Sequence, residues 1–141
     1  MATPRKTGAV MLTYAIDNNT IVYDATQEGG SEHARKHFWV SEEGDGTVKL
    51  ADNNNTLVGE LMDVYADNTC SVATTGEGLQ GISGAANGVN RGNQLVGATG
   101  DAIRGQTGGY VKNAGTQVNG RGVTTTVPAA AKNTVVTINF P

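Results

Sequence analysis

The fold is indicated most clearly by Thr56-Leu-Val-Gly-Glu-Leu-Met-Asp-Val-Tyr65, which is followed by Ala66-Asp-Asn68 and Thr69-Cys-Ser-Val-Ala-Thr-Thr75. The first and third segments are rich in apolar and β-branched residues, which favour strands. The segment between them contains an aspartate and an asparagine, two residue types typical of tight turns. Two strand-like segments around a short polar turn predict an antiparallel β-hairpin.

The same alternation of short strand-like segments and turns extends along the chain in both directions. The sequence contains 20 glycines, and no long stretch repeats apolar residues at helical spacing. It therefore predicts an all-β fold, a small antiparallel β-sandwich or β-barrel with short strands and long Gly/Asn-rich loops. The other predicted strands are Ala9–Ile16, Ile21–Ala25, Phe38–Val40, Thr47–Ala51, Gln94–Val96, Ala102–Arg104, Tyr110–Lys112 and Thr134–Phe140.

Three connecting segments give more specific expectations. Asp17–Thr20 is a turn by composition, so the predicted strands on either side of it should form a second hairpin. Ser31 is placed to cap one turn of helix that gives way to a strand near Phe38. The segment Gly76–Gly92 is rich in glycine and is predicted to be a loop.

Length, composition and charge limit the classes of protein to which the chain can belong. Its 141 residues fit one domain, with residues 1–8 as a flexible, basic N-terminal arm and residues 9–141 as a single β domain. The net charge of −3 argues against nucleic acid as a partner, because that task needs a basic surface. No apolar run has the length of a membrane span, and the first residues lack the apolar region of a signal peptide.

The single cysteine, Cys70, lies between residues that favour strands. One cysteine cannot form a disulfide within the chain. We expect Cys70 to be a small buried apolar residue rather than a reactive thiol.

Two short motifs resemble binding sites but lack the surroundings that such sites require. Gly76-Glu-Gly-Leu-Gln-Gly81 has the glycine spacing of a dinucleotide-binding loop, but the glycines that follow make the necessary helix improbable. A turn is therefore expected there. His33 and His37 have the spacing of two zinc ligands on a helix, yet no third ligand is evident and Arg35 and Lys36 oppose a cation.

Acidic and polar runs offer oxygen atoms without a recognisable calcium motif. Asp52–Asn55 and Glu42–Asp45 are the runs in question, and both have the composition of turns. No serine, histidine and carboxylate stand in the sequence context of a catalytic triad. The sequence therefore predicts a protein that is not an enzyme and has no cofactor and no metal site.

The aromatic residues lie mainly among apolar strand residues, so core packing is their default interpretation. The adjacent Phe38 and Trp39 are the exception that we single out. A lone tryptophan is frequently either a core anchor or an interface hot spot. We therefore name Phe38 and Trp39 as candidates for an interface between copies of the chain.

Four segments between Leu57 and Phe140 share a pattern of short strands joined by glycine- and alanine-containing turns. They are Leu57-Val-Gly-Glu-Leu-Met-Asp-Val64, Asn90-Arg-Gly-Asn-Gln-Leu-Val96, Gly100-Asp-Ala-Ile103 and the closing run from Gly120 to Ile138. Together they resemble the capsid decoration, or cement, proteins of tailed bacteriophages. The resemblance covers a little over half of the chain, and Ser31–Asn55 has no counterpart in it.

The resemblance implies a structural protein of the virion that binds the outer surface of the expanded capsid and stabilises the head. Its partner would be the major capsid protein, its oligomer a homotrimer, and its place the virion surface after assembly in the host cytoplasm. In the N-terminal arm, Thr3, Pro4, Arg5 and Lys6 are the predicted capsid contacts, where the two basic residues would meet acidic capsid groups. Another viral or surface β-module, such as a tail or fibre domain or a glycan-binding module, is the alternative.

Overall fold

The computed structural model describes residues 7–84, 89–103, 105–124 and 130–141. Strands dominate these residues, and the helices are one short 3-10 turn and one short α-helix, which confirms the predicted all-β class. None of the helices in the described ranges has the length and apolar character needed to cross a membrane. The elements are β1 (Thr7–Ile16), η1 (Glu28–Gly30), α1 (Glu32–Arg35), β2 (Trp39–Gly44), β3 (Thr47–Leu50), β4 (Gly59–Val64), β5 (Thr69–Ile82), β6 (Leu95–Ala98), β7 (Tyr110–Asn113), β8 (Val123–Thr124) and β9 (Val135–Phe140).

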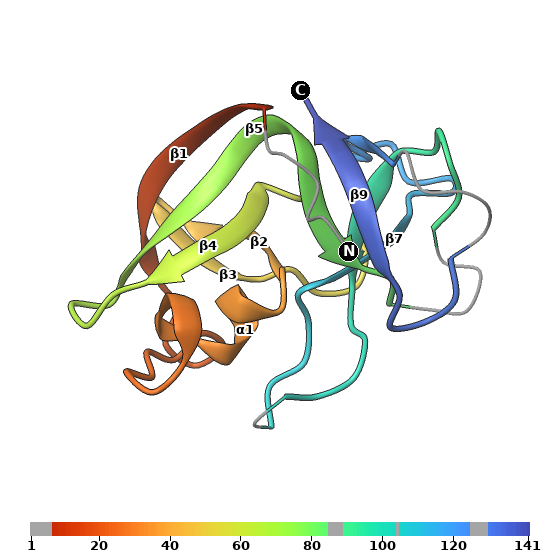
Figure 1. The fold of residues 1–141 in the computed structure, drawn as a ribbon. Coiled ribbons are helices and arrows are strands. Elements are labelled where there is room, and N and C mark those ends of the chain that lie inside the picture. The colour runs from red at the N-terminus through yellow and green to blue at the C-terminus, as the bar shows by residue number, and fades with distance from the viewer. Residues whose placement is uncertain (1–6, 85–88, 104, 125–129) are drawn as a thin grey trace.

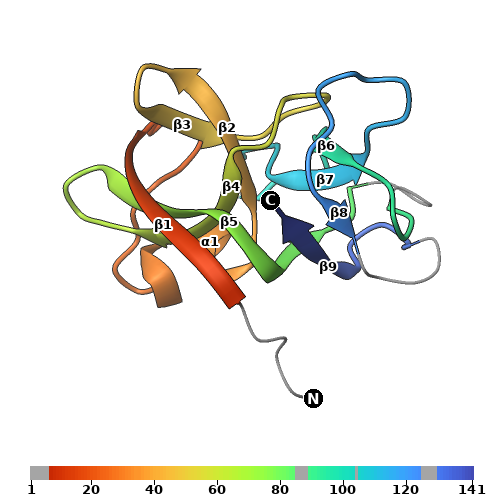
Figure 2. The same cartoon turned by 90° about the horizontal axis from the view of Figure 1, so that it is seen from above.

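Five strands form a small barrel, and four more lie beside it. In the larger sheet the order is β1-β3-β2-β4-β5-β9-β8, and an additional pairing of β1 with β5 closes the first five strands into the barrel (Figure 1). Strands β6 and β7 form a separate antiparallel pair. Viewed from above, β6–β9 gather on one side of the molecule and the barrel on the other, with β5 running between them (Figure 2).

The long strand β5 belongs to both parts of the molecule. Its first half pairs with β1 and β4, and its second half, from Gly76 onward, pairs with β9. The strand changes neighbours at Gly76, where φ is 146° and an added Cβ would lie 3.0 Å from the Cα of Ala9. Glycine is needed at this position for two reasons. A residue with a Cβ would be strained at this positive φ, and its Cβ would press against β1.

The two faces of the barrel strands contact two different hydrophobic cores. Phe38, Val40, Leu61 and Val72 belong to the core inside the barrel. Trp39 and Ala73, each adjacent in sequence to one of those residues, belong to a second core that includes Leu79, Val136, Ile138 and Phe140. Successive side chains of a strand point to opposite faces. Because both faces are buried, the sequences of these strands are continuous apolar segments and do not alternate between apolar and polar residues.

A buried carboxylate connects the barrel to the second half of β5. Glu60 on β4 is 0% exposed, and its Oε1 accepts a hydrogen bond from the backbone N–H of Gln80 at 3.0 Å. Its Oε2 lies 2.9 Å from Nδ1 of His37. On β2, the indole Nε1 of Trp39 donates to the carbonyl of the same Gln80 at 2.8 Å. Trp39 and Glu60 are partners in the β2–β4 pairing. This one pair of residues therefore binds both the backbone N–H and the backbone carbonyl of Gln80.

Arg121 ties the loop before β8 to three other segments. Its backbone exchanges two hydrogen bonds with Leu95, and its Nη1 donates to the carbonyl of Leu57 at 2.9 Å. The guanidinium carbon lies 4.4 Å from the ring centroid of Phe140, which is a cation–π distance. This one side chain therefore helps to fix the end of β9 against the second core.

Several of the predicted elements are confirmed. The hairpin predicted from Thr56 to Thr75 is present as β4 and β5, and the strands expected near Phe38–Val40, Thr47–Ala51, Gln94–Val96, Tyr110–Lys112 and Thr134–Phe140 correspond to β2, β3, β6, β7 and β9. The Oγ of Ser31 accepts from the backbone N–H of His33, as expected of a helix cap.

The predicted hairpin at the N-terminus is wrong. Residues 21–25 form no strand, because Ile21 is fully buried in the barrel core and the following residues turn back toward Gly30, whose carbonyl accepts from the N–H of Asp24. Strand β1 pairs with the distant β5 instead. Strand β1 begins at Thr7, two residues before the predicted strand Ala9–Ile16.

Two further predictions fail in the glycine-rich part of the chain. Residues up to Ile82 of the predicted loop Gly76–Gly92 belong to β5, because β9 supplies the neighbouring strand that glycine-rich sequence alone does not reveal. Around Ile103 the described residues contain only an isolated bridge to Gln106 where a strand was expected.

Close packing of β4 on β5 predicts that Gly59→Ala is strongly destabilising. An added Cβ at Gly59 would lie 2.1 Å from the carbonyl oxygen of Ala73, a backbone atom that cannot move aside. We expect a loss of about 1–3 kcal/mol or more in the free energy of unfolding, measured by urea denaturation. Gly44→Ala is the matched control, because Gly44 is also in a strand and has open space around it. Equal stability of the two variants would contradict this account.

The buried carboxylate gives a second prediction, which concerns Glu60→Ala. The change leaves the N–H of Gln80 and the ring of His37 without this acceptor, so we expect a loss of about 3 kcal/mol or more. Glu43→Ala is the control, since Glu43 forms an exposed pair with Lys49 and should contribute less than about 1 kcal/mol. Denaturant titration of both variants measures the difference, and a loss at Glu60 no larger than that at Glu43 would refute the proposed role.

Candidate functional site

Strand β1 exposes three consecutive large apolar side chains. Val10 is 49% exposed, and Met11 and Leu12 are each 47% exposed. They are consecutive, so Met11 and Leu12 leave opposite faces of the strand. Single exposed apolar residues are ordinary on a protein surface, whereas three in succession on one strand make that strand a candidate for interaction. We therefore take β1 as the candidate binding surface.

The pairing register shows that Met11 and Leu12 each lie at the end of a row of side chains from one of the two cores. Met11 is opposite Ala73, which is opposite Glu60, which in turn is opposite Trp39. Residues directly opposite one another in paired strands share a face of the sheet. Met11 is thus the last member of the row that contacts the second core.

Leu12 occupies the equivalent position in the barrel core. It lies opposite Val72, and Val72 is opposite Leu61, both of which are fully buried. Leu12 nevertheless remains half exposed, because no strand covers it on the other side among the described residues. Both cores therefore reach the molecular surface at adjacent residues of the same strand.

One backbone edge of β1 is open along most of its length. One edge pairs with β5, whereas in the described ranges β3 meets β1 only at Ala15 and Ile16. The β2–β3 hairpin turns at this point, and the carbonyl of Gly46 accepts from the N–H of Ala15 at 2.9 Å. Met11–Thr13 thus offers a short regular strand edge of the kind used for strand addition, while register shifts and a φ of 66° at Gly8 make the edge irregular before Met11.

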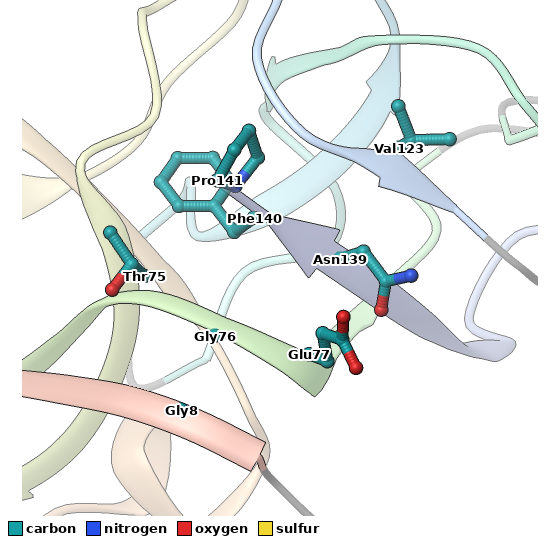
Figure 3. A pocket seen from close by; sticks show the side chains of 8 residues that line it. All are labelled: Gly8, Thr75, Gly76, Glu77, Val123, Asn139, Phe140 and Pro141. Atoms are coloured by element: carbon teal, nitrogen blue, oxygen red, sulfur yellow. The ribbon is translucent and has the colours of Figure 1, made fainter.

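A pocket of about 520 Å³ opens beside the start of β1 (Figure 3). It lies where β5 changes its neighbours, and the ring of Phe140 contributes an apolar wall. Asn139 bridges the irregularity in the β5–β9 pairing, since its Oδ1 accepts from the N–H of Gly78 at 3.2 Å. The pocket is lined by Gly8, Thr75, Gly76, Glu77, Val123, Asn139, Phe140 and Pro141.

Of the residues proposed from the sequence, Phe38 and Trp39 do not lie on this surface. Thr3, Pro4, Arg5 and Lys6 lie outside the described residues. Phe38 and Trp39 are both fully buried inside the single chain, where Phe38 packs against Tyr110 and Trp39 meets Phe140 edge to face. Their burial places them in the core rather than at an interface between copies, because their side chains have no surface to offer.

The two histidines do not form a paired metal site. His33 is in α1 and buried, whereas His37 follows the helix with φ of 62° and faces Glu60. The helix is too short to bring both rings to one face. Among the residues that the structure describes, no group of three His, Cys, Asp or Glu side chains is placed to hold a metal ion.

The other candidate motifs have structural roles in the described chain. Gly76–Gly81 lies within β5 and is a bent strand, so the expected turn is wrong. Asp52 and Asn55 form a turn, in which the side-chain Oδ1 of Asn55 accepts from the backbone N–H of Asp52 and the Asp52 carboxylate accepts from the Thr99 hydroxyl.

The sequence of β1 is conspicuously apolar, but this character favours a buried strand over an exposed binding surface. Val10, Met11 and Leu12 are consecutive, and no charged residue occurs between Thr7 and Ile16. Such a segment ordinarily indicates a strand buried on both faces. Only the pairing with β5 and the early end of β3 show that one edge and parts of both faces are open.

Comparison of the chain with protein-family models, with curated proteins and with solved structures finds no match.

The buried thiol gives a prediction about alkaline pH. Cys70 is fully buried, as expected, and burial raises the pKa of its thiol from 9.0 to about 11. Between pH 9.0 and about 11 the Cys70 thiol loses its proton in the unfolded chain but keeps it in the folded chain. The free energy of unfolding therefore falls as the pH rises through this range. We expect wild type to lose roughly 2–3 kcal/mol relative to Cys70→Ala over this range.

Urea denaturation of both proteins across that pH range measures the effect. The alanine variant serves as the control, because it retains every other group that titrates in alkali. A stability difference that stays constant with pH would contradict the assignment.

Proposed function

We propose that the protein is a structural protein of a phage virion that binds the outer surface of the capsid and stabilises the expanded head. The observation that carries the proposal is the open, apolar strand β1, because it is a surface built for association with another polypeptide. The resemblance of Leu57–Phe140 to capsid decoration proteins supports the choice of partner.

The physical properties of the surface suit a coat formed at many equivalent positions. The exposed apolar part of β1 is short, so one contact would be of modest strength. On an icosahedral shell the same contact repeats, and an oligomer that engages several positions at once gains through effective concentration. A homotrimer, as the resemblance implies, would provide this gain.

The basic residues that precede β1 in sequence extend the proposal. Arg5 and Lys6 come directly before the strand, with Thr3 and Pro4 ahead of them. In the proposed complex these four residues contact the capsid, and the two positive charges meet acidic capsid groups. The arm and β1 would then contribute two kinds of contact, one electrostatic and one apolar.

Co-sedimentation with expanded and unexpanded phage heads tests the proposed function. Wild type should sediment with expanded heads and much less with unexpanded heads. Leu12→Lys should weaken binding by roughly tenfold or more, because it places a charge where an apolar side chain would be buried. Deletion of residues 1–6 should weaken binding further and make the remainder less sensitive to salt.

Val118→Lys is the matched control, since Val118 is fully exposed in a turn away from β1 and should tolerate the charge. Val10→Lys is a second β1 variant in case Leu12→Lys unfolds the chain, which thermal denaturation would reveal. A wild-type protein that binds neither form of head would overturn the proposed function.

A further inference from the structure

A second pocket, of about 350 Å³, opens where the β2–β3 hairpin meets the segment that joins β3 to β4. That segment borders the second core, in which Ala51 and Leu57 are buried. A pocket of this size lies at the small end of the range of small-molecule sites and takes a ligand of about one sugar ring. Most of its lining residues are polar, and they are Ser41, Glu42, Lys49, Asn55, Thr56, Leu57, Val58 and Arg121.

Arg121 supplies this pocket with a positive charge that is held in place by neutral groups. Its Nη1 donates to the carbonyl of Leu57, and its guanidinium lies over the ring of Phe140. In the part of the chain that the structure describes, no carboxylate forms an ion pair with Arg121, which is exposed. Its other N–H groups are therefore left for a ligand. A fixed guanidinium of this kind binds a carboxylate through two parallel hydrogen bonds.

The opposite wall of the pocket provides further donors. Ser41 and Lys49 are partners in the β2–β3 pairing, so their side chains leave the same face of the hairpin. The Nζ of Lys49 lies 3.2 Å from the carboxylate of Glu43, which occupies part of its donor capacity. The hydroxyl of Thr56 accepts from the side-chain amide of Asn119 at 2.8 Å, so its own proton is left to donate.

Glu42 makes the pocket unfavourable for a multiply charged anion such as phosphate. It is exposed and pairs with Val48 of the barrel core, so it approaches the pocket from the other face of β2. A phosphate bound to Arg121 would be repelled by this carboxylate. A ligand with one carboxylate and several hydroxyls avoids the conflict. Hydroxyl groups donate to Glu42 and also accept from Lys49 and Thr56.

We propose that this pocket binds an acidic sugar, a uronic acid whose carboxylate is held by the guanidinium of Arg121. The ring hydroxyls bind Lys49, Thr56 and Glu42, and the half-buried Val58 contacts the C–H groups of the ring. The site is distinct from β1, and the inference does not rest on the proposed function. It adds recognition of an acidic carbohydrate to the binding of a capsid.

Four small ligands test this chemistry with the full-length protein. Sodium glucuronate is the probe, and glucuronamide keeps its hydroxyls but replaces the carboxylate with a neutral amide. Acetate has the carboxylate without the hydroxyls, and inorganic phosphate is the multiply charged anion. Titrations followed by backbone amide chemical shifts should show glucuronate binding about tenfold more tightly than each of the other three. The shifts should be concentrated at the residues that line the pocket.

Variants of two lining residues locate the interaction. Arg121→Lys keeps the positive charge but loses the planar fork, so glucuronate binding should weaken about tenfold. Thr56→Val removes one hydroxyl without changing the shape of the side chain and should weaken binding about threefold. It decides the test if thermal denaturation shows that Arg121→Lys unfolds the chain. Arg35→Lys is the matched control, because Arg35 is an exposed arginine of α1 that does not line the pocket.

Glu42→Gln tests the origin of the selectivity. Removal of its negative charge should raise the affinity for phosphate and narrow the preference for glucuronate. Unchanged selectivity in this variant would refute the role of Glu42 and with it the reason for preferring a sugar acid over phosphate.

The remaining outcomes are equally decisive. Absence of glucuronate binding, acetate or phosphate binding as tight as that of glucuronate, or equal effects of Thr56→Val and Arg35→Lys would overturn the inference, whatever the phage heads do. Selective glucuronate binding by a protein that ignores phage heads would support the inference and overturn the proposed function alone.

Discussion

The arrangement of the whole molecule depends on the polar clamp around Gln80. Glu60 accepts from its N–H and Trp39 donates to its carbonyl, so a residue of β5 beyond the barrel is fixed to the β2–β4 pair. A buried carboxylate is costly to desolvate, and this one is satisfied by the peptide on one oxygen and by His37 on the other. The clamp sets the path of β5, and that path separates the two cores.

Among the described residues, β5 is the one strand that pairs with β1 along most of its length. Gly76 already pairs with Phe140 of β9 on one edge, while the next residue, Glu77, still pairs with Thr7 of β1 on the other. The short β2–β3 hairpin reaches β1 only at its far end. The barrel is therefore closed at one end and open at the other, and the opening coincides with the ends of both apolar rows.

The features that could be predicted from the sequence are those set by neighbouring residues. The hairpin around Asp67 and Asn68 and the strand that ends at Phe140 have local signals in their turns and β-branched residues. Ile21–Ala25 has the same signals, but its tertiary contacts bury Ile21 and leave no neighbouring strand. The glycines of β5 indicate a loop until the close approach of Ala9 is known. Exposure of β1 and the role of Glu60 depend on pairings between distant segments, which no local pattern reveals.

The pairing of β1 with β5 also has a consequence for biosynthesis. Met11 and its partner Ala73 are about sixty residues apart, so β1 leaves the ribosome long before the strand that covers its other edge. During that interval an uncharged, apolar, extended segment has both edges free, which is a state prone to intermolecular pairing. Contacts between such distant residues also slow folding. The strand through which we propose the mature protein binds is therefore the one that most needs protection while the chain is being made.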